Sequence, residues 1–392
     1  DTVWLDGNDK VSVISLPGLV SSTFTWETVN SFNVGFDVSA FNNRLQVVFD
    51  WFKRKTTGML SEGIEIPSVV GAGAPLQNIA DLSSKGWEIN LSWRDRIGNF
   101  SYNIGFNIYD SRAFIDKFNN ESGFVDSNYV GKELGEYWGY VSDGYYTIDD
   151  FVLEDAQKGV WTLKDNVVSI QGVVPQPGDE KFKDLDGDNI ISPASSTLSD
   201  SGDRKVIGSK TPRYQFGANI GVGYKGLSLD VRLQGVGKRD YVLGGAALFP
   251  FAGSSASDAV FQPLFYNQTD YWSAVSYDPN DPDFMKAKNP NAKLFRIYDQ
   301  GNNVTSNTRA SDKYIQNAAY LRVKNITLAY SFPKNWVQKA FMKDAKIYLS
   351  IENPFTFSSL PKGYDPEGNE YNEIVWNYPY YRTISLGANI TF

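Results

Sequence analysis

Residues 377–392, with the sequence NYPYYRTISLGANITF, decide how the rest of the chain is interpreted. From Thr383 onward, small or polar residues alternate with apolar ones as far as Phe392. Successive side chains of a β-strand point to opposite sides, so this pattern gives one apolar face and one polar face. An aromatic last residue on the apolar face is typical of a membrane β-barrel. The segment therefore predicts a barrel strand whose apolar face meets lipid.

The same alternation recurs in hairpins along the chain. In one later segment the apolar residues change phase after Val323, which predicts a β-bulge near Lys324 and Asn325. The predicted turns are residues 41–44, 95–99, 225–226 and 333–343, and the predicted strands lie within 26–38, 45–51, 87–94, 100–109, 214–224, 227–234, 314–332, 345–357 and 377–392. The sequence thus predicts an all-β fold with about nine strands.

Composition excludes several classes of protein. The chain has 392 residues with no Cys and no His, which rules out disulfides, a Ser-His-Asp triad and a His-ligated zinc site. Its net charge of −8 argues against nucleic acid, which needs clustered Lys and Arg. No apolar run approaches the roughly 18 residues of a membrane helix. The first residues lack the features of a signal peptide, and we expect a fragment of a longer chain.

Connection lengths separate a membrane barrel from a soluble β-sandwich, whose strands alternate in the same way. Short connections alternate with long ones, as in outer-membrane barrels with short periplasmic turns and long external loops. We therefore predict a transmembrane antiparallel β-barrel in the outer membrane of a Gram-negative bacterium. The long connections are residues 61–83, 112–212, 243–312 and 358–378, of which 112–212 and 243–312 form the two longest extracellular loops.

Motifs spread over nearly the whole chain resemble the SusC/RagA family of TonB-dependent outer-membrane transporters. They are FNVGFD (32–37), NNRL (42–45), KTTGML (55–60), SKGWE (84–88), PGD (177–179), KDLDGD (183–188), DRKVIG (203–208), YLRVKNITL (320–328), GYDPE (363–367) and YPYYR (378–382). The resemblance implies a barrel of about 22 strands, of which this chain would be strands 14 to 22. It also implies import of glycan or peptide oligomers with a SusD-like surface lipoprotein. TonB would act through an amino-terminal part outside this sequence.

Three carboxylates at alternate positions match the start of an EF-hand-like calcium loop, which offers hard oxygen ligands: Asp184, Asp186 and Asp188. The match is incomplete, because the sixth position is Asn189 and the twelfth is Ser195. Asp200 or Asp203 would have to fold back to complete the ligand shell. The alternative is an acidic exposed turn held by Asx hydrogen bonds. A bound Ca²⁺ would stabilise an external loop, since no base or nucleophile accompanies it.

The predicted external loops are rich in aromatic residues. Such rings stack on sugars or on peptide side chains and are also favoured where proteins meet, so a substrate or the lipoprotein lid is the expected partner. The alternative is that the rings pack the loops together. The candidates are Tyr137, Trp138, Tyr140, Tyr145, Tyr271, Trp272, Tyr364 and Trp376.

These observations favour a non-enzymatic importer of nutrient oligomers that requires no cofactor. The competing hypothesis is a surface or secreted β-rich module, such as a carbohydrate-binding protein or an adhesin. The carboxylate pair Asp149 and Asp150 raises a glycoside hydrolase as a third hypothesis, which lacks a visible catalytic partner. A soluble module would bury its apolar strand faces, whereas the importer would expose them to lipid.

Overall fold

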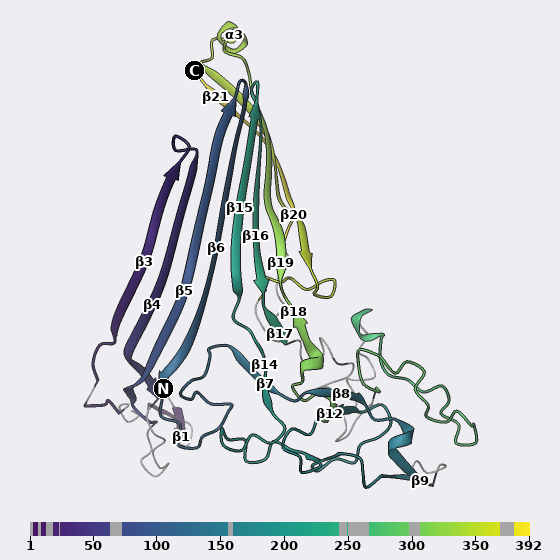
Figure 1. Ribbon diagram of the computed structural model, residues 1–392. Helices are drawn as coiled ribbons and strands as arrows, with labels where there is room; N and C mark the ends of the chain where they lie inside the picture. The colour runs from purple at the N-terminus through teal and green to yellow at the C-terminus, as the bar shows by residue number, and fades with distance from the viewer. Residues whose placement is uncertain are drawn as a thin grey trace. The chain divides into compact units, whose positions relative to one another are not determined.

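The chain folds mainly into β-strands, as the alternation predicts. In the computed structural model, residues 3–6, 9–12, 19–22, 24–62, 73–155, 160–242, 249, 266–297, 306–368 and 380–392 are described. Nine strands of this part form one sheet in the order β21-β20-β19-β16-β15-β6-β5-β4-β3 (Figure 1). They are β3 (Thr28–Ala40), β4 (Leu45–Glu62), β5 (Leu76–Ile97), β6 (Phe100–Lys117), β15 (Arg213–Tyr224), β16 (Leu227–Lys238), β19 (Tyr320–Ser331), β20 (Asp344–Ser358) and β21 (Thr383–Thr391). The predicted all-β fold is confirmed.

Strand register places apolar residues opposite one another on one face of the sheet. The pairing from β6 to β21 is antiparallel throughout. One row is Ile104, Ile220, Val231, Ile326, Ile351 and Ile384, and another is Tyr102, Val222, Leu229, Leu328, Leu349 and Leu386. Neighbouring strands lie about 4.8 Å apart, so the side chains within a row contact one another. We call this side of the sheet the apolar face and the opposite side the polar face.

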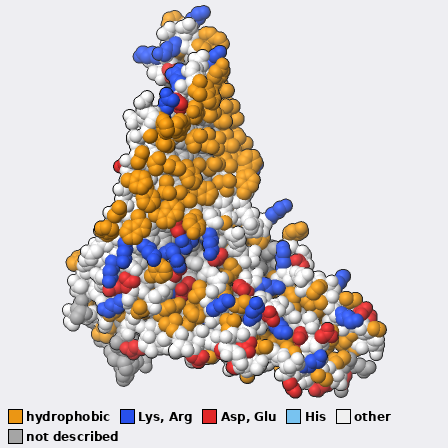
Figure 2. All heavy atoms as spheres, viewed as in Figure 1, with side chains coloured by type: hydrophobic (Ala, Val, Ile, Leu, Met, Phe, Trp, Pro, Cys, Tyr) orange, Lys and Arg blue, Asp and Glu red, His pale blue; other side chains and the backbone are white. Residues whose placement is uncertain are grey.

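The apolar face is exposed in the described part of the chain. Ile104 is 47% exposed and Leu386 is 82% exposed. Hydrophobic side chains form a continuous band over the strands in Figure 2. A soluble sandwich would bury this face against a second sheet. The exposed face instead has the character of a barrel wall that meets lipid.

Short turns join the long strands at one end. The turns after β3 and β15 form where the sequence predicts them. The turn after β5 is shorter than the predicted 95–99, because β5 continues to Ile97 and only two residues form the turn. Pairing with the neighbouring hairpin accounts for the extension, since Arg44 and Asp95 form an ion pair at 3.0 Å. Charged residues that indicated a turn therefore belong to the end of a strand.

The turn between β19 and β20 is the longest at this end of the strands. It contains the short helix α3 (Lys334–Val337) and a 3₁₀ turn, η6 (Gln338–Ala340). Phe341 ends η6 with a left-handed backbone, at φ 59°. No helix among the described residues has the length and apolar character needed to cross a membrane.

The bulge predicted from the phase change is confirmed in β19. The register of β19 shifts between Val323 and Asn325 against β20 and at the same place against β16. Lys324 is therefore left without a partner residue in either ladder. On β20 the matching irregularity contains Asn353, whose φ is 49°, and Pro354, which has no N–H to donate.

The long connections contain short paired strands. β6 continues to Lys117, so the first residues of the predicted loop 112–212 belong to a strand. The ends of loop 243–312 are joined by pairing of β17 (Asp240–Val242) with β18 (Ile315–Asn317). The remaining elements are β1 (Val3–Asp6), β2 (Asp9–Ser12), β7 (Glu136–Gly139), β8 (Ser142–Tyr145), β9 (Phe151–Asp155), β10 (Val160–Leu163), β11 (Ser169–Ile170), β12 (Glu180–Phe182), β13 (Ile190–Ile191), β14 (Lys205–Ser209), η2 (Ile148–Asp150), η4 (Tyr266–Gln268) and η5 (Asp312–Tyr314).

Two compact units divide the chain. The first comprises Asp1–Val34, Trp51–Gly86 and Ser111–Leu134, and the second comprises Gly35–Asp50, Trp87–Asp110 and Gly135–Phe392. Within the first unit the Asn78 side chain donates to the Thr25 carbonyl at 2.9 Å. The second unit contains the loop cores and the residues discussed below.

Candidate functional site

The polar face between β6 and β15 is built from alternating amides and glycines. Asn103 lies opposite Gly221, and Gly105 lies opposite Asn219. A Cβ added to either glycine would overlap the asparagine side chain opposite, so glycine leaves the space in which each amide lies. The row that contains Asn103 and Gly221 continues with Asp230 on β16. The face therefore presents hydrogen-bonding groups and carboxylates, the chemistry of a water-filled barrel interior.

A buried arginine holds a loop segment against the polar face. Arg322 on β19 has a side chain that is 1% exposed, and it forms ion pairs with Asp365 and, at 2.9 Å, with Glu367. Lys324 pairs with the same Glu367 at 2.7 Å. Both carboxylates lie in segment 359–368, which follows β20. A buried charge is costly unless it is paired, so these contacts fix the segment to β19.

Two hydrophobic cores form within the long loops. We call the cluster of Tyr140, Tyr146, Phe151, Ile170, Phe182 and Ile191 the first loop core. The second loop core consists of Tyr145, Tyr241, Phe249, Trp272, Ala274, Met285, Ala292, Leu294, Phe295, Tyr314, Ala318 and Leu360. Trp161 packs against both cores, and its ring stacks on Phe284 with centroids 5.9 Å apart. The loops therefore have packed interiors of their own.

A buried polar network joins the two longest loops. The side chain of Asn307 donates to Asp179 at 2.8 Å and accepts from the N–H of Glu180 at 2.6 Å. Glu180 in turn accepts from the Ser311 hydroxyl at 2.9 Å. Desolvation by burial raises the pKa of Glu180 to about 7, although several hydrogen bonds and the nearby Lys313 act in the opposite direction. The network thus contains a carboxyl group that titrates near neutral pH.

The predicted aromatic contacts divide into two groups. Tyr140, Tyr145 and Trp272 are buried in the loop cores, and Trp272 lies against Gly178, where a Cβ would collide with the indole ring. These three side chains therefore pack the loops together, which is the alternative that the sequence left open. The partly exposed group is Tyr137, Trp138, Tyr271 and Tyr364, and Trp376 lies outside the described residues.

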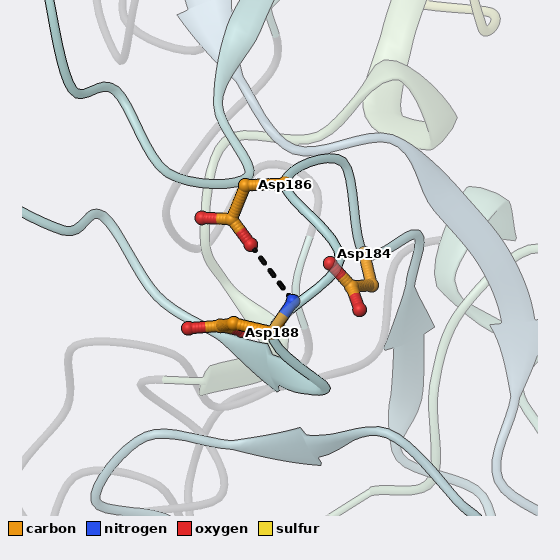
Figure 3. Close-up of side chains that lie close together, drawn as sticks. All are labelled: Asp184, Asp186 and Asp188. Carbon is orange, nitrogen blue, oxygen red and sulfur yellow. Dashed lines mark hydrogen bonds between the residues drawn. The ribbon is translucent and has the colours of Figure 1, made fainter.

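The predicted acidic cluster forms, with one member missing. The carboxylates of Asp184, Asp186 and Asp188 lie within 4.8 Å of one another (Figure 3). Asp203 does not join them, because it is buried and its carboxylate accepts the main-chain N–H groups of Leu185 and Ser192. The structure therefore groups three of the four predicted ligands.

Main-chain hydrogen bonds also reach the acidic cluster. Asp184 accepts the N–H of Gly187 at 2.6 Å and of Asn189 at 2.9 Å, which lowers its pKa. The N–H of Asp188 bonds to Asp186 at 3.2 Å, as the dashed line in Figure 3 shows. That bond lowers the pKa of Asp186, but desolvation and the neighbouring carboxylates outweigh it and raise the pKa. The cluster thus combines Asx turns with a concentration of negative charge that a cation would relieve.

The carboxylate pair considered for glycoside hydrolysis has a structural role. Asp150 accepts the main-chain N–H of Thr147 at 2.7 Å, at the start of η2, and lies 3.6 Å from the Lys181 ammonium group. Asp149 precedes it within the same 3₁₀ turn, and its carbonyl accepts from Lys164 at 2.6 Å. The pair therefore stabilises a loop turn.

Sequence reasoning missed the polar residues that organise the loops. Arg322, Glu180 and Asn307 join segments far apart in the sequence, and no local pattern links them. One available signal was the position of Arg322 between the apolar Leu321 and Val323, which places it on the polar face.

Comparison with known proteins finds relatives along nearly the whole chain. No family model matches the chain. TonB-dependent receptor P3 of Formosa agariphila is 27% identical, with 98% of this chain and 36% of the relative covered. TonB-dependent receptor SusC of Bacteroides thetaiotaomicron is 23% identical, with 96% of this chain and 33% of the relative covered. This chain thus spans about a third of the length of these curated relatives.

A solved structure agrees with this fold. The structure of the RagAB peptide transporter superimposes with a TM-score of 0.64 at 21% identity, covering 100% of this chain and 38% of that chain. A second structure, RagAB in the open-open state, gives a TM-score of 0.59 at 20% identity. The exposed apolar face, the nine-stranded sheet and the curated relatives agree on one location, the outer membrane. Over nearly its whole length the chain is therefore similar to SusC-like, TonB-dependent outer-membrane receptors.

Proposed function

We propose that the protein imports a nutrient oligomer, a glycan or a peptide, across the outer membrane. Import would be energised through TonB, and a SusD-like surface lipoprotein would cover the external side. The sheet forms part of the barrel wall, and its polar face lines the path of the substrate. The role is non-enzymatic and needs no cofactor.

One observation carries this proposal: the same sheet has an exposed apolar face and a polar face to which an external loop is fixed by buried ion pairs. Lipid covers the first face in a barrel, and water and substrate meet the second. The Arg322 ion pairs with Asp365 and Glu367 hold segment 359–368 on the polar side. An adhesin or soluble binding module has no need for such an uncovered apolar wall.

We further propose that the partly exposed aromatic residues of the loops contact the substrate or the lipoprotein. The candidates are Tyr137, Trp138, Tyr271 and Tyr364. Tyr271 and Tyr364 pack against the second loop core, so each ring has a fixed position. A fixed ring loses little conformational entropy on binding, which favours stacking.

Growth and uptake assays test the proposed import. A strain lacking the full-length gene is grown on single pools of oligosaccharides or peptides, and uptake of fluorescent oligomers is measured with and without a protonophore. We expect loss of growth on one pool and uptake that requires the proton gradient. Unchanged growth and uptake on every pool would overturn the proposal.

Two further measurements test the contacts. Double alanine substitution of Tyr271 and Tyr364 is expected to reduce uptake several-fold, whereas Phe36→Ala on the apolar face serves as the matched control. Co-purification from detergent-solubilised membranes with a tag on the full-length receptor tests for the lipoprotein. Equal uptake by the loop variant and the control would show that Tyr271 and Tyr364 do not contact the substrate.

A further inference from the structure

A cavity lies on the apolar face at its periplasmic end, between the α3 turn and strands β20 and β21. Its volume is about 270 Å³, and its polar lining is small. Ala345 pairs with Ile390, and Ile347 pairs with Ala388, so alanines and isoleucines alternate across its floor. The other wall is made by the turn and its neighbours, namely Phe332, Trp336, Val337 and Met342. The cavity is thus a recess in a surface that already meets lipid.

Main-chain hydrogen bonds keep the turn in place over the cavity. The N–H of Lys343 donates to the Thr391 carbonyl on β21 at 2.7 Å, and that of Met342 donates to the Val337 carbonyl at 3.1 Å. Val337 itself is buried. The backbone of the turn is therefore held against β21 beside the recess.

Positive charge is concentrated around the recess. Residues 333–346 carry four lysines and a single acid, Asp344, in a chain whose net charge is −8. The lysines are Lys334, Lys339, Lys343 and Lys346. None of them forms an ion pair within the described part of the chain, and Lys and Arg side chains gather at this end of the hydrophobic band in Figure 2. The charge is thus available to an external anion.

Exposed aromatic residues mark this turn as lying at a membrane interface. Trp336 is 63% exposed and Phe341 is 92% exposed. Tryptophan is enriched where the hydrocarbon core meets the headgroups, because its ring has an apolar body and a polar N–H. Short turns of outer-membrane barrels lie on the periplasmic side, where the leaflet consists of glycerophospholipids.

We propose that this recess holds one acyl chain of an anionic glycerophospholipid of the periplasmic leaflet, with its phosphate held by the lysines of the turn. The apolar walls exclude water from the chain, and ammonium groups are suitable partners for a phosphodiester. The site would fix a lipid beside β21 and anchor the turn at the membrane surface.

Photocrosslinking tests the location of the lipid. Full-length receptor in nonionic detergent is incubated with phosphatidylglycerol that carries a diazirine in its acyl chain, and labelled peptides are identified by mass spectrometry. We expect label concentrated on the turn between β19 and β20. Label spread evenly over the apolar face, or absent from this turn, would overturn the proposal.

Matched variants test the recess and the lysines separately. Ala388→Phe fills the recess and is expected to weaken phosphatidylglycerol binding at least tenfold in native mass spectrometry. Leu386→Phe, on the same face of β21 but outside the recess, is the control and should leave it unchanged. The substitutions Lys339→Gln and Lys343→Gln should each weaken phosphatidylglycerol binding by about fivefold, since each lysine near an anionic surface contributes about 1 kcal/mol.

The outcomes decide between occupants. Phosphatidylcholine with the same acyl chains should bind more weakly than phosphatidylglycerol, and Lys225→Gln in the turn between β15 and β16 should have no effect. Equal binding by Ala388→Phe and Leu386→Phe would refute the recess as the site. Capture of a periplasmic protein at Trp336, in place of the lipid label, would refute the lipid as its occupant.

Discussion

Replacement of Ile104 by arginine tests the assignment of the two faces most directly. Ile104 lies midway along the apolar residues of β6, between Phe100 at the turn and Ile108. At about 3.3 Å per residue and a tilt of about 40°, these ends are roughly 20 Å apart along the membrane normal. The apolar band of a barrel is about 25 Å tall, so Ile104 lies close to its midplane.

The expected cost follows from that depth. Ile104 pairs directly with Ile220, and its side chain is 47% exposed on the apolar face. Its row across β15, β16 and β19 consists of Ile220, Val231 and Ile326, so an arginine there would meet no carboxylate from these strands. Arginine at the midplane of a barrel costs about 2–4 kcal/mol. Asn103→Arg is the matched control, because that side chain faces the polar side, opposite Gly221 on β15 and two strands from Asp230 on β16.

Both variants are made in the full-length receptor and measured in lipid bilayers. Samples are equilibrated in increasing concentrations of denaturant and run on a gel without boiling, so that folded and unfolded protein form separate bands. The measured quantity is the denaturant concentration at which half of the protein is unfolded. We expect a clear decrease in the midpoint for Ile104→Arg and a change of less than about 1 kcal/mol for Asn103→Arg. Equal decreases would show that the apolar face does not meet lipid, and a larger decrease for Asn103→Arg would reverse the assignment.

Three further predictions concern the loops. Burial raises the pKa of Glu180 from 4.5 to about 7, so the neutral carboxyl group stabilises the loops below pH 4.5, and this stability is lost as the pH rises to 7. Hydrogen exchange of the loop cores, corrected for intrinsic rates, should therefore become faster over this pH range. Glu180→Gln should remove the pH dependence. Arg322→Met leaves Glu367 without its buried partner, which should lower the stability of this contact by about 3 kcal/mol and make the segment after β20 sensitive to protease. Protease resistance equal to that of the parent protein would contradict the role of the ion pair. If the acidic cluster binds Ca²⁺, terbium luminescence should be quenched by Ca²⁺ and abolished by Asp186→Asn, and persistence of the signal in that variant would place the ion elsewhere.

Sequence reasoning succeeded where a property repeats with the period of a strand. The alternation predicted nine strands, and the phase change after Val323 predicted the bulge in β19. The error at residues 95–99 arose because a charged strand end outside the membrane resembles a turn in composition. Asp95 at this strand end pairs with Arg44, which lies 51 residues away in the sequence, so only the folded sheet reveals the pairing.

The candidate site was less accessible to such reasoning. Trp272 and Tyr271 are adjacent in the sequence, yet one is buried in a loop core and the other is partly exposed. Their difference depends on Gly178, which lies 94 residues from Trp272 and provides the space for its ring. Pairings of this kind, like that of Glu180 with Asn307, are set by tertiary structure and leave no periodic trace.

The bulge at Lys324 determines which side of the membrane wall receives charge. Below it, the even-numbered residues Ile326 and Leu328 point to lipid; above it, the extra residue turns even-numbered Arg322 inward, toward Glu367. A regular strand that kept Lys324 without a bulge would turn Arg322 toward hydrocarbon. Deleting the lysine removes the bulge and leaves Arg322 facing inward, because Val323 and Asn325 already lie opposite consecutive residues of β16. Inserting a further residue beside Lys324 should therefore be far more harmful than deleting the lysine, since the insertion would turn the outer half of β19 over and bring the guanidinium group to the lipid side.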